Sequence, residues 1–173
     1  MDRLKATICC IALLCASPIL TFAQQPSLSQ KSVESALTLT ETALKNYQTT
    51  LGTLRAEPLV KATSDTDAEA IATGGMAIIL IRADATKDGT FDLFELVALC
   101  GNVDAAAMNA ALTAGSLLTK VPIVDPKEAL TIAHSAEALV GNAQQLKEAS
   151  DALWDLLEKA MHNSKMRIRL TKG

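Results

Sequence analysis

Residues 125–160 read DPKEALTIAHSAEALVGNAQQLKEASDALWDLLEKA, and this stretch decides the fold. Its apolar positions are spaced alternately by four and three residues, which is the period of a helix with one buried face. Asp125 offers an N-cap carboxylate, Pro126 suits the first helical position, and Glu128 lies three residues after the cap. The period continues through Gly141, so we predict one helix of about 35 residues, roughly 50 Å long. The apolar seam comprises Ile132, Ala136, Leu139, Ala143, Leu146, Ser150, Leu153, Leu157 and Ala160.

A second seam with the same period lies near the other end of the chain, and Pro58 ends it. It predicts a helix over about 32–57. Between the two long helices the pattern predicts a helix from Thr66 to about Ala83, with Gly74-Gly75 marking a kink or a close helix contact. The second seam comprises Val33, Leu37, Thr40, Leu44, Tyr47, Leu51 and Leu54.

Two further helices are expected in the middle of the chain. One spans Leu93 to Cys100 and is closed by Gly101-Asn102, and the other spans Ala105 to about Lys120 with Asp104 as its cap. The sequence therefore predicts an all-α fold, an antiparallel bundle of about five helices, with the helical domain at residues 32–163.

Composition limits both the core and the partners. Hydrophobic residues make up 49% of the 173 residues but aromatic residues only 3%, so Ala and Leu must fill the core of a single domain. The net charge is −3, with no basic excess, so we expect no nucleic-acid partner.

Residues 1–23 have the features of a signal peptide. Arg3 and Lys5 precede an apolar run from Ala6 to Ala16, and a small residue, Ala23, ends the segment. We therefore expect export to the periplasm or the medium after cleavage near Ala23, with an uncleaved anchor as the alternative. Residues 24–31 would then form a flexible lead, and Cys100 would be the single remaining thiol, a small buried hydrophobe.

The basic tail, residues 164–173, alternates basic and apolar side chains. A frayed end is the first expectation, and a strand seeking a partner or a patch touching anionic lipid are the alternatives. We expect no membrane contact through this tail.

Residues 84–95 carry the chemistry. Calcium takes six to eight oxygen ligands, and a 12-residue loop can supply them from alternate positions. Carboxylates or hydroxyls stand at the first, third, fifth, ninth and twelfth positions, Gly89 is sixth, and Thr90 would offer its main-chain carbonyl. The candidate calcium ligands are Asp84, Thr86, Asp88, Thr90, Asp92 and Glu95.

This segment resembles the calcium-binding loop of the EF-hand family, and the resemblance covers about 30 residues. It implies a helix-loop-helix unit binding one Ca²⁺, with Glu95 clamping the ion and Phe91 anchoring the loop. The sequence departs from the family pattern because Thr86 stands third and because no second loop is visible to pair with the first. A metal-free helix connection with a capping acid remains the alternative.

The function expected from the sequence is therefore calcium binding by an exported helical protein, for stability or for calcium-dependent partner binding. The alternative is a metal-free scaffold or adaptor whose seams bind a protein partner or a second copy. His134 with Glu137, and Glu158 with His162, read as solvated pairs on a helix face. No catalytic constellation is present, so we do not expect an enzyme.

Overall fold

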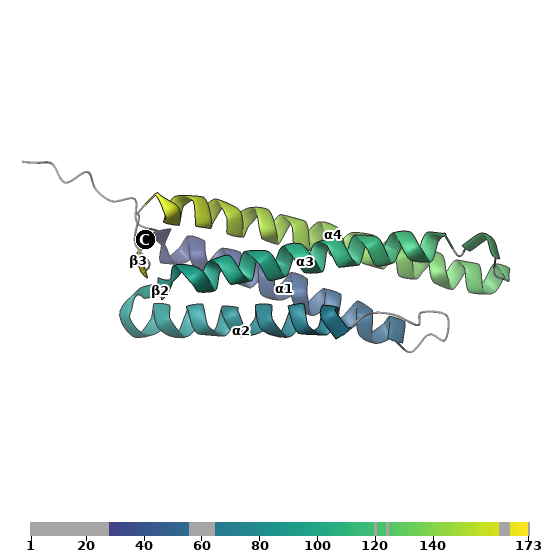
Figure 1. Ribbon diagram of the computed structural model, residues 1–173, viewed down its shortest axis with the longest axis horizontal. Helices are drawn as coiled ribbons and strands as arrows, with labels where there is room; N and C mark the ends of the chain where they lie inside the picture. Colours follow the sequence, from purple (N-terminus) through teal and green to yellow (C-terminus); the bar gives the residue numbers. More distant parts are fainter. Residues whose placement is uncertain (1–27, 56–64, 120, 124, 163–166, 173) are drawn as a thin grey trace, which may run out of the picture.

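The structure, a computed structural model, describes residues 28–55, 65–119, 121–123, 125–162 and 167–172. The predicted signal peptide, residues 24–27 of the lead and Pro58 lie outside this part. Four helices dominate the fold: α1 (Gln30–Arg55), α2 (Asp65–Asp88), α3 (Leu93–Leu118) and α4 (Pro126–Met161), with a 3₁₀ turn, η1 (Val121–Ile123), before α4 (Figure 1). The predicted long helix at the carboxyl side is confirmed, and Asp125 caps it by accepting a hydrogen bond from the Lys127 amide at 2.8 Å.

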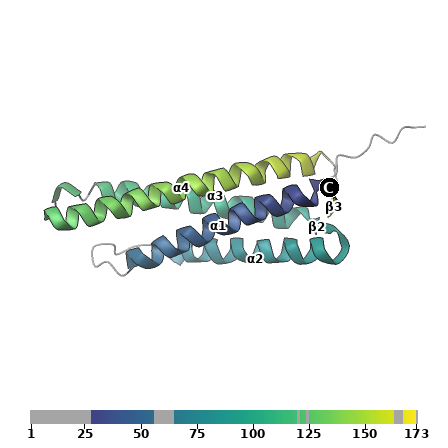
Figure 2. The same cartoon turned by 180° about the vertical axis from the view of Figure 1, so that it is seen from behind.

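The helices form an antiparallel bundle in which each of α2 and α4 packs against both α1 and α3. In Figure 1 α3 lies in front and α1 behind, and Figure 2 shows the reverse side with α1 towards the viewer. One side of α3 therefore faces away from the other helices.

Small aliphatic side chains fill the interior, as the composition predicts. Every member of the α1 seam is buried, and every member of the α4 seam is buried except Ala143, which is partly exposed. The interior also holds Cys100, as expected of a small hydrophobe, and several alanines of α3. The buried alanines of α3 are Ala106, Ala110 and Ala114.

The prediction of about five helices is wrong, because the two middle helices are one. α3 continues through Gly101 and Asn102, and the Asn102 side-chain amide donates to the Ala98 carbonyl at 2.8 Å within the helix. Asp104 does not cap a new helix, since its carboxylate accepts hydrogen bonds from Ser150 and Trp154 of α4. Continuous packing of α3 against α4 therefore outweighs the local helix-ending preference of Gly and Asn.

A small sheet crosses one end of the bundle. Its strands are β1 (Leu28–Ser29), β2 (Thr90–Asp92) and β3 (Arg167–Thr171), in the order β1-β3-β2, with β1 parallel and β2 antiparallel to β3. The expectation of a frayed tail is thus wrong, and the alternative of a strand seeking a partner is correct. The predicted lead is also corrected in part, because residues 28–29 form β1 and α1 begins at Gln30.

Polar side chains tie the helices together inside the bundle. Asp67 of α2 is 2% exposed and accepts a hydrogen bond from the Asn109 side-chain amide of α3 at 2.7 Å. The buried Tyr47 hydroxyl of α1 makes no hydrogen bond of ordinary geometry, and burial, with the nearby Asp67 carboxylate, raises the pKa of Tyr47. A buried polar side chain without a partner is costly. These residues therefore favour the alignment of the helices that pairs Asp67 with Asn109 over alignments shifted along the helix axis.

Gly74 and Gly75 provide a matched test of helix packing. A Cβ at buried Gly74 would lie 3.1 Å from Leu44 Cδ1 of α1, whereas a Cβ at Gly75 would meet no atom within 4 Å. Gly75→Ala should therefore stabilise the fold by up to about 1 kcal/mol in urea unfolding, the helix-propensity gain. Gly74→Ala should gain less, because Leu44 must move. An equal increase in the free energy of unfolding for both variants would show that the close contact with α1 does not constrain α2.

Candidate functional site

The first five positions of the predicted loop are helical. α2 was expected to end near Ala83, but it runs to Asp88 and so includes Asp84, Thr86 and Asp88. Nothing in these residues stops a helix until Gly89, whose φ of +69° is a conformation that L side chains rarely adopt. The EF-hand-like segment is therefore a helix extension followed by a sharp turn at its sixth position.

The second half of the segment contains a short strand that the all-α prediction did not include. Thr90–Asp92, the seventh to ninth positions, form β2, and Phe91 is buried opposite Ile168 of β3. The Leu170 amide also donates to the Gly89 carbonyl at 2.7 Å, which extends the pairing to the turn. The tail therefore provides the strand that pairs with this segment.

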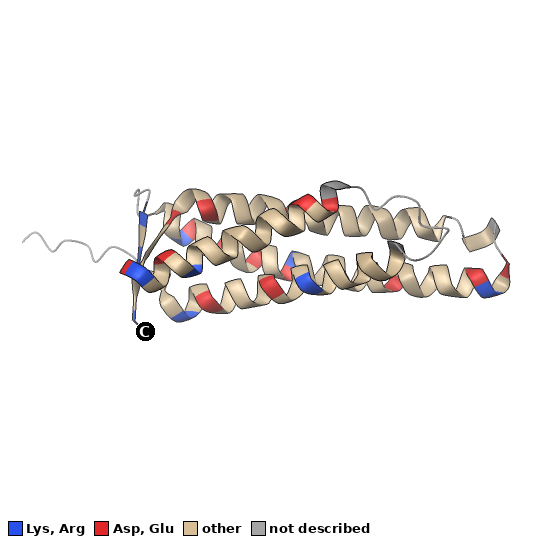
Figure 3. Ribbon diagram, turned by 90° about the horizontal axis from the view of Figure 1, so that it is seen from below, with Lys and Arg blue, Asp and Glu red and all other residues tan. Residues whose placement is uncertain are grey.

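Asp84 and Asp88 stand one helical turn apart and meet the same cation, Arg167 of β3. The Arg167 Nη2 atom lies 2.8 Å from Asp84 Oδ2 and 3.5 Å from Asp88 Oδ2, and it also donates to Thr90 Oγ1 at 3.0 Å. Acidic and basic residues lie along the whole bundle, and both kinds occur at the end that carries β3 (Figure 3). Hydrogen bonds from the Thr90 hydroxyl and amide, more than the charge of Arg167, lower the pKa of Asp88.

Two candidate ligands have other local roles. Thr86 is exposed on α2, and its hydroxyl donates to the Arg82 carbonyl at 2.8 Å. Asp92 caps α3, because its Oδ1 accepts a hydrogen bond from the Phe94 amide at 2.8 Å. Neither side chain hydrogen-bonds to Arg167, although Asp92 stands opposite Arg167 in the pairing of β2 with β3.

Glu95, on the first turn of α3, has one unsatisfied carboxylate oxygen. Its Oε2 atom is buried and has no hydrogen-bond partner. Burial is the main cause that raises the pKa of Glu95, and the negative charges of Asp84 and Asp92 add to it, whereas a hydrogen bond from the Asp92 backbone and the charge of Arg167 lower it. The first, ninth and twelfth positions of the segment therefore influence one another electrostatically.

The structure thus brings Asp84, Asp88 and Thr90 together around Arg167, with Glu95 nearby. Thr86 lies outside this cluster, whereas Asp92 borders it, opposite Arg167 and near Glu95. The described residues contain no group of three or more His, Cys, Asp or Glu side chains arranged to hold a metal ion. The prediction from sequence missed Arg167. The alternation of basic and apolar residues in the tail was the available signal, because it is the pattern of a strand with one charged face.

Comparison with known proteins adds no family, since no family model, curated protein or solved structure matches the chain.

The polar pair predicted on α4 lies outside the charge cluster. His134 Nδ1 lies 3.8 Å from Glu137 Oε2, and both side chains are more than two-thirds exposed, as expected of a solvated pair.

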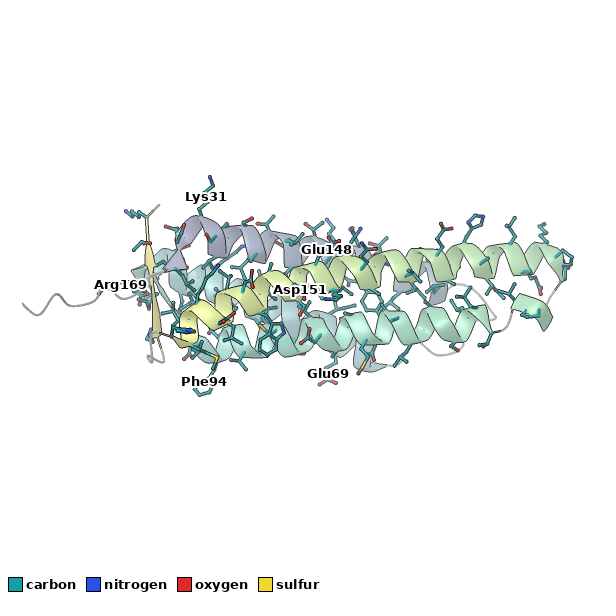
Figure 4. All side chains as sticks on the ribbon, turned by 90° about the horizontal axis from the view of Figure 1, so that it is seen from above. Lys31, Glu69, Phe94, Glu148, Asp151 and Arg169 are labelled. Atoms are coloured by element: carbon teal, nitrogen blue, oxygen red, sulfur yellow. The ribbon has the colours of Figure 1, made fainter. Side chains whose placement is uncertain are left out.

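Arg167 and Arg169 allow a matched test of the charge cluster. Both are exposed on one face of β3, but Arg169 makes none of the contacts described for Arg167 (Figure 4 labels Arg169). Arg167→Ala should destabilise the fold by about 0.5–1 kcal/mol at low salt, the value of a partly exposed ion pair, and by less at 1 M salt. Arg169→Ala should leave urea unfolding nearly unchanged. Equal effects of the two substitutions would rule out a specific role for Arg167.

Proposed function

We propose that this protein is an exported helical bundle that binds one calcium ion at residues 84–95, where the ion takes the place of Arg167. Asp84, Asp88, Asp92 and Glu95 would supply charge, Thr86 a hydroxyl oxygen and Thr90 its main-chain carbonyl. Without calcium the bundle would keep its fold, because Arg167 then supplies the positive charge. The ion would stabilise the fold or alter the surface that a partner meets.

The observation that carries this proposal is the buried, unpartnered Oε2 of Glu95 beside Asp84. Asp84 and Asp88 share the guanidinium of Arg167, and the partly buried Glu95 adds a third carboxylate close to Asp84, so the cluster keeps a negative excess. A buried acceptor without a donor costs roughly 1–3 kcal/mol, which a divalent cation would recover. Gly89, with its positive φ at the sixth position, favours the same interpretation.

The residues fit the ion in part, and the remainder requires a local change. Residues 84–88 form the last turn of α2 and would have to leave the helix so that Thr86 turns inward. Helix ends open at low cost, whereas β2 and Phe91 are held by β3 and would remain. Because unwinding and loss of the Arg167 contacts oppose binding, we expect weak affinity, on the order of 10⁻⁵ to 10⁻³ M, which suffices outside the cell.

Glu95→Gln should separate the two roles of this carboxyl group. The pKa of Glu95 is raised in the folded state, so the stability associated with its protonation is present at low pH and lost as the pH rises through that pKa. In chelator at pH 7 the neutral glutamine should therefore raise the melting temperature, by about 2–4 °C for each kcal/mol relieved.

Millimolar calcium should raise the melting temperature of the parent chain, and equal magnesium should raise it less, because magnesium dehydrates reluctantly. Glu95→Gln should abolish the calcium shift. A parent chain that shows no calcium shift, or a variant that keeps the full shift, would contradict the proposed site.

Arg167→Gln should strengthen calcium binding, since it removes the competing cation while keeping a polar side chain. An exposed ion pair of about 1 kcal/mol corresponds to roughly fivefold tighter binding in isothermal titration calorimetry. Arg169→Gln is the control and should bind as the parent does. Unchanged or weaker calcium binding by Arg167→Gln would show that the arginine does not occupy the ion's place.

A metal-free scaffold is the second candidate, and Arg167 itself favours it. The guanidinium already gives Asp84 and Asp88 a cation, so the end of the bundle can be stable without a metal ion. In that case the protein would act through protein contacts alone. Calorimetry with calcium separates the two candidates, because the scaffold predicts no binding heat.

A further inference from the structure

α3 is apolar on both of its faces. Its inner face is buried in the bundle, and its outer face exposes large hydrophobic side chains, with Phe94 63%, Met108 63% and Leu112 65% exposed. Glu95 and Asp104 are its only charged residues. A helix that is hydrophobic all round is normally covered on all sides, so its outer face needs a cover that the described part of the chain does not supply.

The outer face repeats with the spacing of a helix–helix contact. Positions spaced alternately by four and three residues form a continuous seam along α3, which we call the outer seam. All of its members are exposed except Ala105, which is partly exposed, and Phe94 points away from the bundle (Figure 4). The outer seam comprises Phe94, Ala98, Gly101, Ala105, Met108, Leu112 and Gly115.

Two members of the outer seam are glycines that the bundle does not require. A Cβ added at Gly101 or at Gly115 would meet no atom within 4 Å, in contrast to Gly74. A glycine inside a helix costs about 0.5–1 kcal/mol relative to alanine. Close approach by another helix would explain these two positions, because it requires the absence of a side chain.

We propose that the outer seam binds the same seam of a second copy, antiparallel, about a twofold axis at Ala105. This arrangement sets Phe94 opposite Gly115, Ala98 opposite Leu112 and Gly101 opposite Met108, so that a large side chain meets a small one at each level. Ala105 meets itself at the axis. A twofold interface must be self-complementary, and the order of large and small residues along this seam has that property.

The charged side chains beside the outer seam also favour pairing with a second copy. Asp104 is engaged with Ser150 and Trp154, so its carboxylate is turned towards α4. Beside it, Lys147 and Asp151 of α4 form an ion pair at 2.9 Å. In an antiparallel dimer the two copies present this ion pair in opposite order along the seam. Lys147 of each copy would then lie towards Asp151 of the other copy.

A lipid surface is the competing cover. By length and composition α3 could cross a membrane, and only a third of its most apolar window is buried in the bundle. Length and composition alone are weak grounds, because the buried helix of a protein core passes the same test. Lipid chains do not need small residues opposite large ones. The alternation along the outer seam therefore favours a helix as its partner.

The first experiment measures the mass of the full chain in solution by light scattering. A chelator is present, so that the result does not depend on calcium. The parent should have twice the chain mass at tens of micromolar. Leu112→Glu should weaken the dimer roughly tenfold or more, and Gly101→Met should do the same while leaving the monomer folded, since it fills open space and favours helix. Leu130→Glu is the matched control, because Leu130 is 61% exposed on α4 away from the seam, and it should remain dimeric.

The second experiment tests the orientation with single cysteines, in a full chain carrying Cys9→Ser, Cys10→Ser and Cys15→Ser and retaining buried Cys100. Ala105→Cys lies at the axis and should form a disulfide between copies under mild oxidation. Ala98→Cys should not, because its counterpart lies several turns away in an antiparallel pair. Cross-linking at both positions would overturn the antiparallel arrangement.

A monomeric parent chain would overturn the proposal, and so would a dimer that both Leu112→Glu and Gly101→Met leave intact. A monomer that instead floats with vesicles of neutral and anionic lipid would assign the seam to a membrane surface. None of these results depends on calcium binding, so failure here leaves the proposed metal site untouched.

Discussion

Small side chains in the core constrain this protein more than any other feature. Burying a leucine contributes about 1.5–3 kcal/mol and an alanine much less, so a core with few aromatic residues has to be long. The unbroken seams of α1 and α4 provide that length, and alanines of α3 let α4 approach closely. Such an interior buries few charged groups, and among the described residues Asp67 is the buried one. The candidate site accordingly lies at one end of the bundle, where the turn at Gly89 and the strand β3 meet.

Under the proposed function, that end would combine two modes of cation recognition in the same few residues. Asp84 and Asp88 stand at positions one and five of the segment that resembles a calcium loop, and the same spacing places them on one face of a helix. In the helix they bind a guanidinium, and in an unwound form they would join Glu95 around an ion. The balance between these forms would depend on the stability of one helical turn and on Arg167, about 80 residues away in sequence.

The sequence predicts the parts of this fold that depend on period and capping. The seams of α1 and α4 and the cap at Asp125 follow directly from spacing and residue type. The prediction of a helix end at Gly101-Asn102 was wrong because packing outweighs the local preference of these two residues. Leu99, Val103 and Ala106 continue one buried face of α3 through this point. The extension of α2 through Asp88 was hidden because the segment suits both a helix and a loop. The alternation in the tail indicates a strand with one charged face, but it does not give the partners of Arg167, which lie about 80 residues away in sequence.

Strand β3 also ties together the first and last described strands, because Leu28 pairs with Leu170, and it pairs with β2 through Phe91 and Ile168. Closing a ring of that size costs entropy that local helix formation does not, so the sheet should form after the helices have packed. Until residues 167–171 have been synthesised, the start of α1 has no strand to hold it. The sheet is therefore the late clasp of a bundle whose helices are already in place.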